Sequence, residues 1–455
     1  MDFAGKKILV VGLARSGMAA ISLLHKRGAI LTACDIKKAE ELGEKINLLE
    51  SMDVRVFAAS YPVIDRKAFD MVVTSPGVRL EFEPIHQARL MGIPVISEVE
   101  LAYAIKAPEV ELCAVSGTNG KTTTTSLLQY IFAKDGRRSV AGGNIGVPLT
   151  TLIDGMEDGI ITVEISSFQL ETTINFKPHI CGLLNITPDH LDWHKTLDNY
   201  IRAKTRIFAN QTSDDYTILN YEDHEIRNMA SSCKSKVLFF STDRVLKEGA
   251  FVDDNYIKVI IDNIQFNICT LDEVLLRGKH NLENILCASA MAIAAGVDTR
   301  VLRQSLSSFK GIRHRLEEVA SKNGVLYIND SKGTNPDSTI RAIESFNEPV
   351  ILIAGGRNKG SDFAELAKLI NNRVKELVIL GEAREVIKTA VMETGFRNIH
   401  EVEDFSSAVA KAHELSNPGD VVLLSPACAS WDMFDNYEQR GDLFCELVGK
   451  LENTY

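Results

Sequence analysis

The chain has 455 residues, 45% hydrophobic and 24% charged, with a formal net charge of −11. This length predicts about two to four domains, and the acidic balance argues against nucleic acid or an anionic membrane surface as the main partner. No apolar run reaches the roughly 18 residues of a membrane span. The eight cysteines include no C-x-x-C pair, and the N-terminus lacks the regions of a signal peptide. We therefore expect a cytoplasmic protein without a disulfide framework or membrane contact.

The first predicted block, residues 1–99, is an α/β unit with a glycine-rich turn. An apolar strand over residues 8–11 leads into GLARSG at 12–17, then a helix, then a strand that ends at Asp35. Ala14 stands where a dinucleotide fingerprint has its middle glycine. An NAD-dependent nucleotide-sugar oxidoreductase is therefore the less favoured alternative, and we expect this block to bind another phosphorylated nucleotide or sugar.

The second predicted block, residues 100–311, begins with a candidate phosphate loop. A strand over residues 112–115 leads into GTNGKTTT at 117–124, a helix is expected to open on Lys121 and Thr122, and its amphipathic part is expected over 126–133. Backbone N–H groups and a positive helix end would hold an anion there. Lys121 would reach terminal phosphates and Thr122 would offer its hydroxyl to Mg²⁺. An ordinary surface turn is the alternative, but the pattern favours nucleotide binding.

Candidate metal ligands follow two strands of the same block. A strand over residues 160–163 runs into Glu164, and a strand over 182–186 runs into a segment with His190 and His194. Carboxylate and imidazole groups at neighbouring strand ends suit Mg²⁺ beside a nucleotide. Zinc on the two histidines, four residues apart, is the alternative. For His194 alone, packing at the start of a helix is the favoured interpretation.

Several other polar side chains have two interpretations each. Lys204 and Arg206 fall in a helical pattern, and their spacing alone favours a solvated helix face. Asn281 and Asn284 lie one turn apart, where paired amides could read a base edge or cap a helix. Arg315 lies at a supposed domain joint, where its guanidinium could reach a triphosphate.

The third predicted block, residues 312–455, repeats the alternation of strands and helices. Strands are expected over residues 326–328, 350–353, 377–380 and 421–424, each followed by a polar or glycine-rich cluster. Ligands of open α/β sheets bind beyond the carboxyl ends of the strands. The chain is therefore predicted to be α/β with mainly parallel sheets, and this block to have a binding face. A guanine-specific P-loop GTPase is disfavoured, since NKGSD at 358–362 is one residue too long for N-K-x-D.

Taken together, the motifs resemble the Mur ligases over essentially the whole chain. They are GTNGKTTT, VEISSFQLE, LNITPDHLDWH, Y-x-x-A-K, HN-x-x-N, and HR followed by DSKGTNP. The GLARSG start and the closing SPACASWDMFDNYEQRG are most similar to the members that add D-glutamate. Folylpolyglutamate synthase and the other Mur enzymes share the central domain, so these two stretches carry the finer distinction.

The resemblance implies three domains: an N-terminal Rossmann-like domain, a central P-loop-type domain and a C-terminal Rossmann-like domain. It implies a monomeric, ATP-dependent amide ligase of peptidoglycan precursor synthesis. The small-molecule substrates would be UDP-N-acetylmuramoyl-L-alanine and D-glutamate, joined through an acyl phosphate. Two Mg²⁺ ions are expected, and Lys204 would be carbamylated, because a carbamate offers a metal two anionic oxygens where an ammonium repels it.

The resemblance also assigns residues by position. The UDP-substrate would be bound by Arg15, Ser16, Asp35, Lys37, Gly77 and Asn144. ATP would be bound by Gly117, Thr118, Asn119, Gly120, Lys121, Thr122, Thr123, Asn284, Arg315 and Asp330. D-Glutamate would be bound by Lys332, Thr334, Lys359, Ser430 and Tyr437, and the metal ions by Thr122, Glu164, His190 and Lys204. Lys121, Lys204, His190 and Lys332 are the expected catalytic residues. The sequence departs mildly from the family pattern, since Tyr437 stands where Phe is expected and Lys37 where Arg is common.

Overall fold

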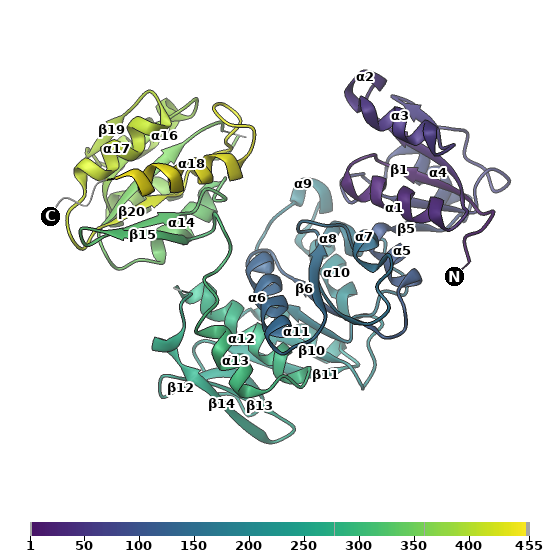
Figure 1. Cartoon of the computed structure of the whole chain (residues 1–455), viewed down its shortest axis with the longest axis horizontal. Coiled ribbons are helices and arrows are strands. Elements are labelled where there is room, and N and C mark those ends of the chain that lie inside the picture. The colour runs from purple at the N-terminus through teal and green to yellow at the C-terminus, as the bar shows by residue number, and fades with distance from the viewer. Residues whose placement is uncertain (1, 277, 359, 452–455) are drawn as a thin grey trace. The chain divides into compact units, whose positions relative to one another are not determined.

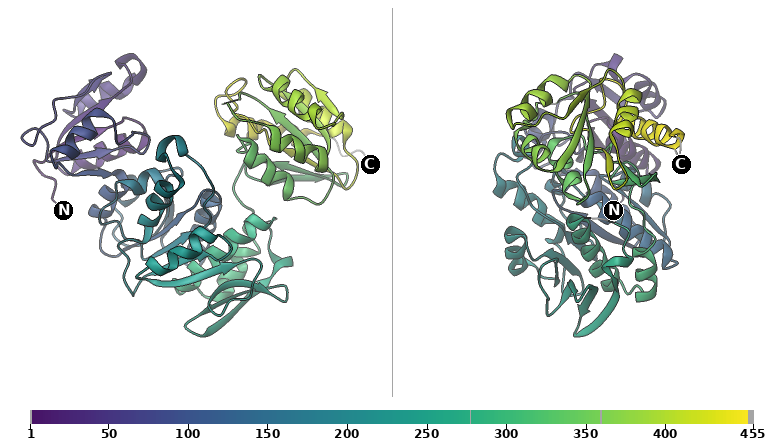
Figure 2. Two further views of the ribbon diagram at one scale, coloured as in Figure 1. Left: turned by 180° about the vertical axis from the view of Figure 1, so that it is seen from behind. Right: turned by 90° about the vertical axis from the view of Figure 1, so that its left-hand side faces the viewer.

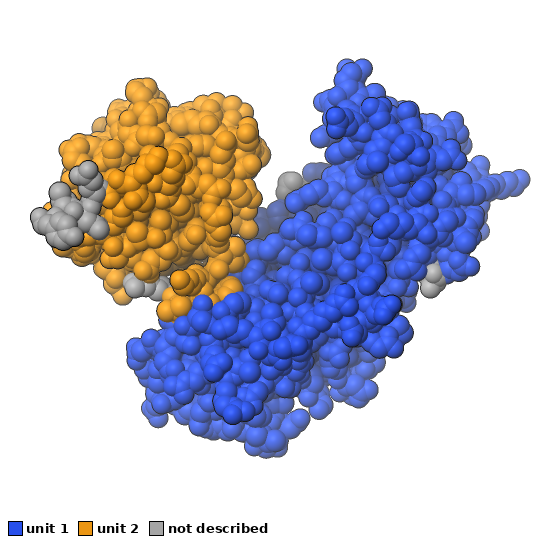
Figure 3. Space-filling model, viewed as in Figure 1, with its two compact units in different colours: residues 1–274, 283–308 blue, residues 275–282, 309–455 orange. Residues whose placement is uncertain are grey.

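The computed structural model describes residues 2–276, 278–358 and 360–451. The chain folds into two compact units, drawn in blue and orange in Figure 3. Unit 1 comprises residues 1–274 and 283–308, and unit 2 comprises residues 275–282 and 309–455. Unit 1 contains two β-sheets and unit 2 contains another (Figure 1).

The N-terminal sheet of unit 1 is parallel throughout, with the order β3-β2-β1-β4-β5. Its strands are β1 (Lys7–Val11), β2 (Ile30–Asp35), β3 (Arg55–Ala58), β4 (Met71–Thr74) and β5 (Val95–Ser97). Its helices are α1 (Arg15–Lys26), α2 (Ala39–Leu42), α3 (Glu44–Ser51), α4 (Glu83–Leu90) and α5 (Glu98–Ile105). The strand order reverses between β1 and β4, and such a switch point is where open α/β sheets bind ligands.

The central sheet of unit 1 has the order β14-β13-β12-β11-β10-β9-β6-β8-β7. Its strands are β6 (Val110–Ser116), β7 (Ser139–Gly143), β8 (Gly159–Glu164), β9 (Ile180–Leu183), β10 (Tyr216–Asn220), β11 (Lys236–Ser241), β12 (Gly249–Asp253), β13 (Tyr256–Ile261) and β14 (Ile264–Thr270). The pairs from β7 to β12 are parallel, and β12, β13 and β14 form an antiparallel meander. The meander adds an edge to the parallel nucleotide-binding type of sheet that the sequence predicts.

The helices of this part are α6 (Lys121–Lys134), α7 (Leu149–Ile153), α8 (Ser167–Glu171), α9 (Leu191–His194), α10 (Leu197–Thr205), α11 (His224–Met229), α12 (Lys279–Ala294) and α13 (Thr299–Leu306). Short 3₁₀ turns lie at Arg206–Phe208, Ala230–Ser232 and Leu271–Glu273. Helix α6 begins at Lys121, as the expected opening on Lys121 and Thr122 predicts, because Gly120 takes a left-handed φ of 84° and turns the chain directly into the helix. One predicted boundary was wrong. Strand β9 ends at Leu183 rather than at residue 186, because the following residues bond the phosphate loop instead of continuing the sheet.

Helix α5 ties the N-terminal sheet to the central part of unit 1. The buried carboxylate of Glu98 accepts hydrogen bonds of 2.6 Å from both the backbone N–H and the hydroxyl of Thr150. The carboxylate of Glu100 accepts backbone N–H groups from residues 174–176 at 2.8 to 2.9 Å. These hydrogen bonds from Thr150 and from residues 174–176 therefore join the two sheets through α5.

The sheet of unit 2 has the order β15-β16-β20-β17-β18-β19, with β15 antiparallel and the other pairs parallel. Its strands are β15 (Glu317–Lys322), β16 (Val325–Asn329), β17 (Val350–Gly355), β18 (Val374–Leu380), β19 (Ile399–Glu401) and β20 (Val421–Leu424), and its helices are α14 (Pro336–Glu344), α15 (Ala364–Arg373), α16 (Arg384–Glu393), α17 (Phe405–Leu415) and α18 (Tyr437–Lys450).

Alternate strand residues of unit 2 point to separate cores on the two faces of its sheet. Leu352 and Leu423 pack with α14, α15 and α16, whereas Ile353 and Leu424 pack with α17 and α18. The ribbon views show helices on both faces of this sheet (Figures 1 and 2). Burial on both faces explains the continuous apolar runs in the sequence. The predicted α/β class with three domains is confirmed, whereas the domain limits after residues 99 and 311 stay predictions. No helix among residues 2–276, 278–358 and 360–451 is long and apolar enough to span a membrane.

Candidate active site

The phosphate loop lies between β6 and α6, at the centre of the parallel strands. Gly117 and Gly120 have φ values of 150° and 84°, and a Cβ on Gly120 would lie 2.2 Å from Oδ1 of Asn284. Both glycines are therefore required by the backbone path and by close packing. The ammonium of Lys121 donates to the backbone oxygens of Gly117 and Thr118 at 2.9 and 2.7 Å. Its positive charge is thus held at the loop, where terminal phosphates of a nucleotide would lie.

Neighbouring strand ends brace this loop. The backbone N–H of Asn119 donates to Oδ1 of Asn185 at 2.8 Å. The hydroxyl of Thr118 lies 3.0 Å from that of Tyr200 and donates to the backbone oxygen of Thr187 at 3.2 Å. Thr122 and Thr123, at the start of α6, are 7% and 5% exposed. The loop is therefore rigidly framed, as phosphate binding by backbone N–H groups requires.

Lys204 is buried beneath the loop rather than on a solvated helix face. Its side chain is among the largest that are fully buried, with 1% exposure. The Nζ atom lies 2.8 Å from the backbone oxygen of Gly117 and 3.4 Å from the Ser116 hydroxyl. Burial, and the charge of Lys121, lower the pKa of Lys204 well below its usual value. Arg206 is also turned inward and donates to the backbone oxygens of Leu170 and Thr173. The solvated-face interpretation is wrong for both, because Lys204, in α10, lies against the phosphate loop and Arg206, in the 3₁₀ turn that follows, bonds backbone oxygens in and after α8.

Glu164 has one carboxylate oxygen suited to a metal ion. Its Oε1 accepts a 2.8 Å hydrogen bond from Nδ2 of Asn144, whereas its buried Oε2 has no hydrogen-bond donor among the described residues. A buried oxygen in this state requires a partner, and carboxylate and hydroxyl oxygens are ligands that Mg²⁺ prefers. Among the residues that the structure describes, no three His, Cys, Asp or Glu side chains gather as a metal site. This Oε2 of Glu164 therefore fits a metal ion, and the Thr122 hydroxyl, at the start of α6, is a further oxygen of the kind that Mg²⁺ prefers.

The two histidines of the LNITPDHLDWH motif differ in exposure. The His190 side chain is 47% exposed, lies 3.4 Å from the Asp189 carboxylate, and packs at a centroid distance of 4.8 Å on Phe168. His194 is 3% exposed and stacks on the same ring, with its Nε2 3.0 Å from the Ser167 hydroxyl. Packing of His194 was the favoured interpretation, but it lies at the end of α9 rather than at a helix start. Zinc finds no third protein ligand beside these histidines among the described residues.

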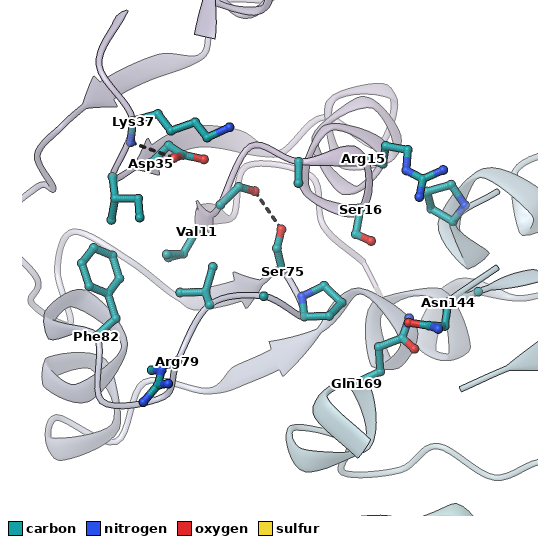
Figure 4. Close-up of a pocket in the computed structure, with 18 of the residues that line it drawn as sticks. Val11, Arg15, Ser16, Asp35, Lys37, Ser75, Arg79, Phe82, Asn144 and Gln169 are labelled. Carbon is teal, nitrogen blue, oxygen red and sulfur yellow. Dashed lines mark hydrogen bonds between the residues drawn. The ribbon is translucent and has the colours of Figure 1, made fainter. Parts of the chain in front are cut away.

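A cavity of about 770 Å³ lies at the carboxyl ends of β1 and β4 (Figure 4). It brings together the residues expected at the UDP-substrate: Arg15, Ser16, Asp35, Lys37, Gly77 and Asn144. Arg79, Glu81, Phe82 and Gln169 also line it. We did not predict these four, although Gln169 lies within the VEISSFQLE motif and could have been found there. In Figure 4, Phe82 lies at one end of the cavity with Asp35, Lys37 and Arg79, and Asn144 and Gln169 lie at the other end.

Asp35 shapes the glycine-rich turn of this cavity. Its Oδ2 accepts a 2.7 Å hydrogen bond from the backbone N–H of Leu13, and its Oδ1 accepts one of 2.9 Å from that of Lys37. Gly17 packs so closely that a Cβ there would lie 1.9 Å from the backbone oxygen of Gly12. Both oxygens of Asp35 are thus used by the protein backbone, which weakens the NAD alternative, in which this carboxylate binds a ribose.

Unit 2 gathers most of the residues expected at D-glutamate. Lys332 and Thr334 follow β16, and the Nζ of Lys332 lies 5.7 Å from the centre of the Tyr437 ring. Ser430 follows β20 and is 2% exposed. Lys359 lies outside the described residues. The structure therefore brings Lys332 and Tyr437 together and places Thr334 and Ser430 on the loops that follow β16 and β20.

A buried guanidinium that the sequence did not single out supports these loops. Arg440 is 2% exposed. It donates to the hydroxyl and backbone oxygen of Ser331 at 2.9 and 2.7 Å, and to the backbone oxygen of Cys428 at 3.3 Å. Burial lowers its pKa to about 10. Its place in the closing motif was the available signal, but nothing in the sequence indicates burial.

The remaining residues expected at ATP are divided between the units. Asn284, in unit 1, is 3% exposed and lies against Gly120 of the loop. Arg315 and Asp330 belong to unit 2. Asp330 accepts a 2.7 Å hydrogen bond from the Ser425 hydroxyl, and burial raises its pKa to about 6. Perturbed carboxyl groups of this kind are frequent at functional sites.

Comparisons with known proteins cover nearly the whole chain. Three family models match it: the MurD-like N-terminal domain of Mur ligases over residues 6–97, the Mur ligase middle domain over 115–292, and the glutamate ligase domain of Mur ligases over 314–428. The chain is 46% identical to the UDP-N-acetylmuramoylalanine--D-glutamate ligase of Pelotomaculum thermopropionicum, over 99% of both chains. It is 43% identical to the ligase of the same name from Clostridioides difficile, over 99% of this chain and all of the relative.

Solved structures of low sequence identity share the fold. UDP-N-acetylmuramate-alanine ligase MurC of Thermotoga maritima is 20% identical, with a TM-score of 0.59 over 98% of this chain and 99% of that one. MurF ligase of the same species, solved in complex with ADP, is 16% identical, with a TM-score of 0.59 over 99% of this chain and 96% of that one. Matching family models, full-length relatives and this fold lead to one assignment. The chain belongs to the Mur ligase family.

Proposed function

We propose that this chain is the ATP-dependent ligase that adds D-glutamate to UDP-N-acetylmuramoyl-L-alanine, in peptidoglycan precursor synthesis. The observation that carries the proposal is the pairing, within unit 1, of a rigid phosphate loop with a cavity that contains every residue expected at the UDP-substrate. The activity for which the two full-length relatives are named supports the same substrates.

The reaction needs an activated carboxylate, because amide formation from a free carboxylate is uphill in water. The terminal carboxylate of the UDP-substrate attacks the γ-phosphorus of ATP in line, so a carboxylate–phosphate bond forms as the bond to ADP breaks. Lys121 stabilises the charge on the phosphoryl oxygens. The amine of D-glutamate then attacks the acyl carbon, and phosphate leaves with the electron pair of the broken bond. The amine also loses a proton, for which His190 is a candidate acceptor, although binding of a metal ion by His190 would compete with that role.

The metal-binding residues are proposed from the surroundings of the loop. Glu164 Oε2 and the Thr122 hydroxyl would hold one Mg²⁺, and a carbamate on Lys204, together with His190, would hold a second. When bound, Mg²⁺ offsets the negative charge of the phosphoryl oxygens. The lowered pKa of Lys204 supports the modification, because only a neutral amine forms the N–C bond to CO₂, and the displaced proton goes to solvent.

The substrate residues follow from the same arrangement. Arg15 and Ser16, in the first turn of α1, would bind the diphosphate with the help of the helix N-terminus. Lys332, Thr334, Lys359, Ser430 and Tyr437 would bind D-glutamate, with the lysines as charge-assisted partners of its carboxylates. Asn284 in unit 1, and Arg315 and Asp330 in unit 2, are also proposed to bind ATP. The proposal includes a cytoplasmic monomer with domains at residues 1–99, 100–311 and 312–455.

The test is phosphate release from ATP across a panel of acceptors and amino acids. UDP-N-acetylmuramoyl-L-alanine, UDP-N-acetylmuramate and UDP-N-acetylglucosamine would each be supplied with D-glutamate, L-alanine or a diamino acid, with Mg²⁺ present. We expect release only with the first acceptor and D-glutamate together. Equal release with another pair would redirect the assignment within the family. Binding of ATP without release in any pair would contradict ligase activity.

A further inference from the structure

The loop that forms one wall of the nucleotide-sugar cavity also contacts α9. Arg79 and Glu81 line the cavity, and Arg79 is labelled in Figure 4. The Cζ atom of Arg79 lies over the ring of Trp193, 5.6 Å from its centroid. Glu81 Oε1 and the Nζ of Lys195 lie 2.9 Å apart. Two side chains of one cavity wall thus meet the short helical segment that directly follows His190.

Trp193 and His190 depend on a common support. The indole Nε1 donates to Glu171 at 3.0 Å, and the Trp193 ring packs edge-on against Phe168 at 4.7 Å. His190 packs on the same Phe168 ring at 4.8 Å. A displacement of Trp193 would therefore disturb the surface on which His190 rests.

The backbone of this segment needs outside contacts to keep its shape. His190 and Lys195, which flank α9, have φ values of 52° and 68°. A left-handed conformation is energetically unfavourable for any residue that has a Cβ atom. It persists only where the surrounding structure imposes it. Helix α9 has only 4 residues, so its internal hydrogen bonds are too few to fix it. Its contacts with α8, with α10 and with the cavity wall must therefore hold it.

From this juxtaposition we propose that Arg79 and Trp193 are positioning residues that couple occupancy of the nucleotide-sugar cavity to the placement of His190. The inference rests on the proposed function. An anionic nucleotide attracts the Arg79 guanidinium from the cavity side, while the indole face holds it on the other side. Filling the cavity then fixes Arg79, Arg79 fixes Trp193, and the surface under His190 becomes ordered for the reaction.

The neighbouring ion pair provides a matched control. The side chains of Glu81 and Lys195 are each 66% exposed, and exposed ion pairs contribute little because water screens them. We therefore assign the coupling to the Arg79–Trp193 contact and not to Glu81–Lys195. Both contacts join the same two segments, so a variant of each separates a specific link from a general loosening.

The first experiment uses Trp193 as its own reporter. The chain has 2 tryptophans, so Trp431→Phe leaves Trp193 as the sole indole. We expect uridine 5′-diphosphate to change the fluorescence emission of Trp193 in a saturable manner. The midpoint of this change should match the Kd for UDP measured by calorimetry. In the variant that combines Arg79→Met with Trp431→Phe, the UDP-induced change in emission should vanish. UDP should still bind this variant, with a Kd raised by no more than about tenfold.

The second experiment separates turnover from binding. With saturating ATP and D-glutamate, Trp193→Leu should lower kcat about threefold to tenfold, the range of a cation–π contact. The KM for the UDP-substrate should stay within about twofold, since the contact orders the chain after binding. Trp193→Phe keeps an aromatic face and should recover most of kcat. Lys195→Ala should stay within about twofold in both quantities.

The outcomes distinguish this inference from the proposed function. Calorimetric binding of UDP without any change in Trp193 emission would overturn the coupling and leave the function standing. The coupling would also be overturned if the emission change persisted in the Arg79→Met variant, or if Trp193→Leu kept the kcat of the parent protein. Complete loss of UDP binding in Arg79→Met would overturn it too, because Arg79 would then be a direct ligand of the nucleotide. Failure of the parent protein to bind UDP would instead contradict the proposed function.

Discussion

Replacement of Lys204 by alanine tests whether this buried amine serves the reaction or only the fold. Lys204 is 1% exposed, and its Nζ lies 2.8 Å from the backbone oxygen of Gly117 in the phosphate loop. If it carries a carbamate for Mg²⁺, the variant should lose most turnover, on the order of 10²-fold or more, as for loss of a group that stabilises transition-state charge.

The structural cost of the substitution is estimated from the buried stem. Lys204→Ala removes three buried methylenes at about 0.8 kcal/mol each, which gives about 2.4 kcal/mol before any cavity cost. Loss of the amine adds little to this cost in unfolding free energy, because the backbone oxygen of Gly117 still accepts a 2.9 Å hydrogen bond from Lys121. Lys204→Met keeps most of the stem and should therefore lie within about 1 kcal/mol of the parent in unfolding free energy.

The assay compares these variants with and without a small carboxylate. Phosphate release would be measured for the parent, Lys204→Ala and Lys204→Met across a series of acetate and Mg²⁺ concentrations. Acetate should partly restore Lys204→Ala in a saturable, Mg²⁺-dependent manner, because it occupies the space of the lost stem and supplies two oxygens. It should not restore Lys204→Met, whose side chain fills that space. Bicarbonate should restore neither variant, because carbamate formation needs the missing amine.

The two variants also separate function from stability. Inactive Lys204→Met with parental stability would support a role in the reaction, whereas lost activity only in Lys204→Ala, parallel to its lower stability, would indicate a packing role. Full turnover of Lys204→Ala without added carboxylate would refute the reasoning.

The remaining predictions concern the loop, the substrate and one buried carboxyl. Lys121→Ala should lower kcat by on the order of 10²-fold while the far-UV circular dichroism stays parental; near-normal turnover at saturating ATP would contradict the assigned role of the loop. L-Glutamate should be a poor substrate, because two carboxylates and an amine fix three points around the chiral carbon; equal rates of phosphate release with both isomers would oppose the assignment. Burial raises the pKa of Asp330 to about 6, so between about pH 4 and 6 the Asp330 carboxyl is protonated in the folded state but ionised in the unfolded state. The free energy of unfolding therefore falls as pH rises through that window. The stability of Asp330→Asn relative to the parent should therefore rise by about 2–3 kcal/mol between about pH 4 and 7. Calorimetry should show this as a difference in melting temperature that grows with pH. The same variant should lose ligase activity.

The sequence was most informative where the chemistry is local in the chain. Gly117 to Lys121 occupy consecutive positions, and a strand, a glycine turn and a helix follow each other without any distant contact. The strands of the C-terminal unit were also readable, because burial on both faces requires continuous apolar runs such as residues 350–353 and 421–424. The end of the strand at residue 183 was missed, because hydrogen bonds to another loop decide it.

The sequence by itself determined the α/β class, the phosphate loop and, through its motifs, the family, because these depend on short-range order along the chain. Only the tertiary structure decided that Lys204 is buried beneath the loop, that Glu164 has an oxygen without a donor among the described residues, and that Arg79 meets Trp193. A helical pattern states which residues share a face but not what covers that face. Desolvation, pKa shifts and contacts between segments more than a hundred residues apart arise only when the elements pack.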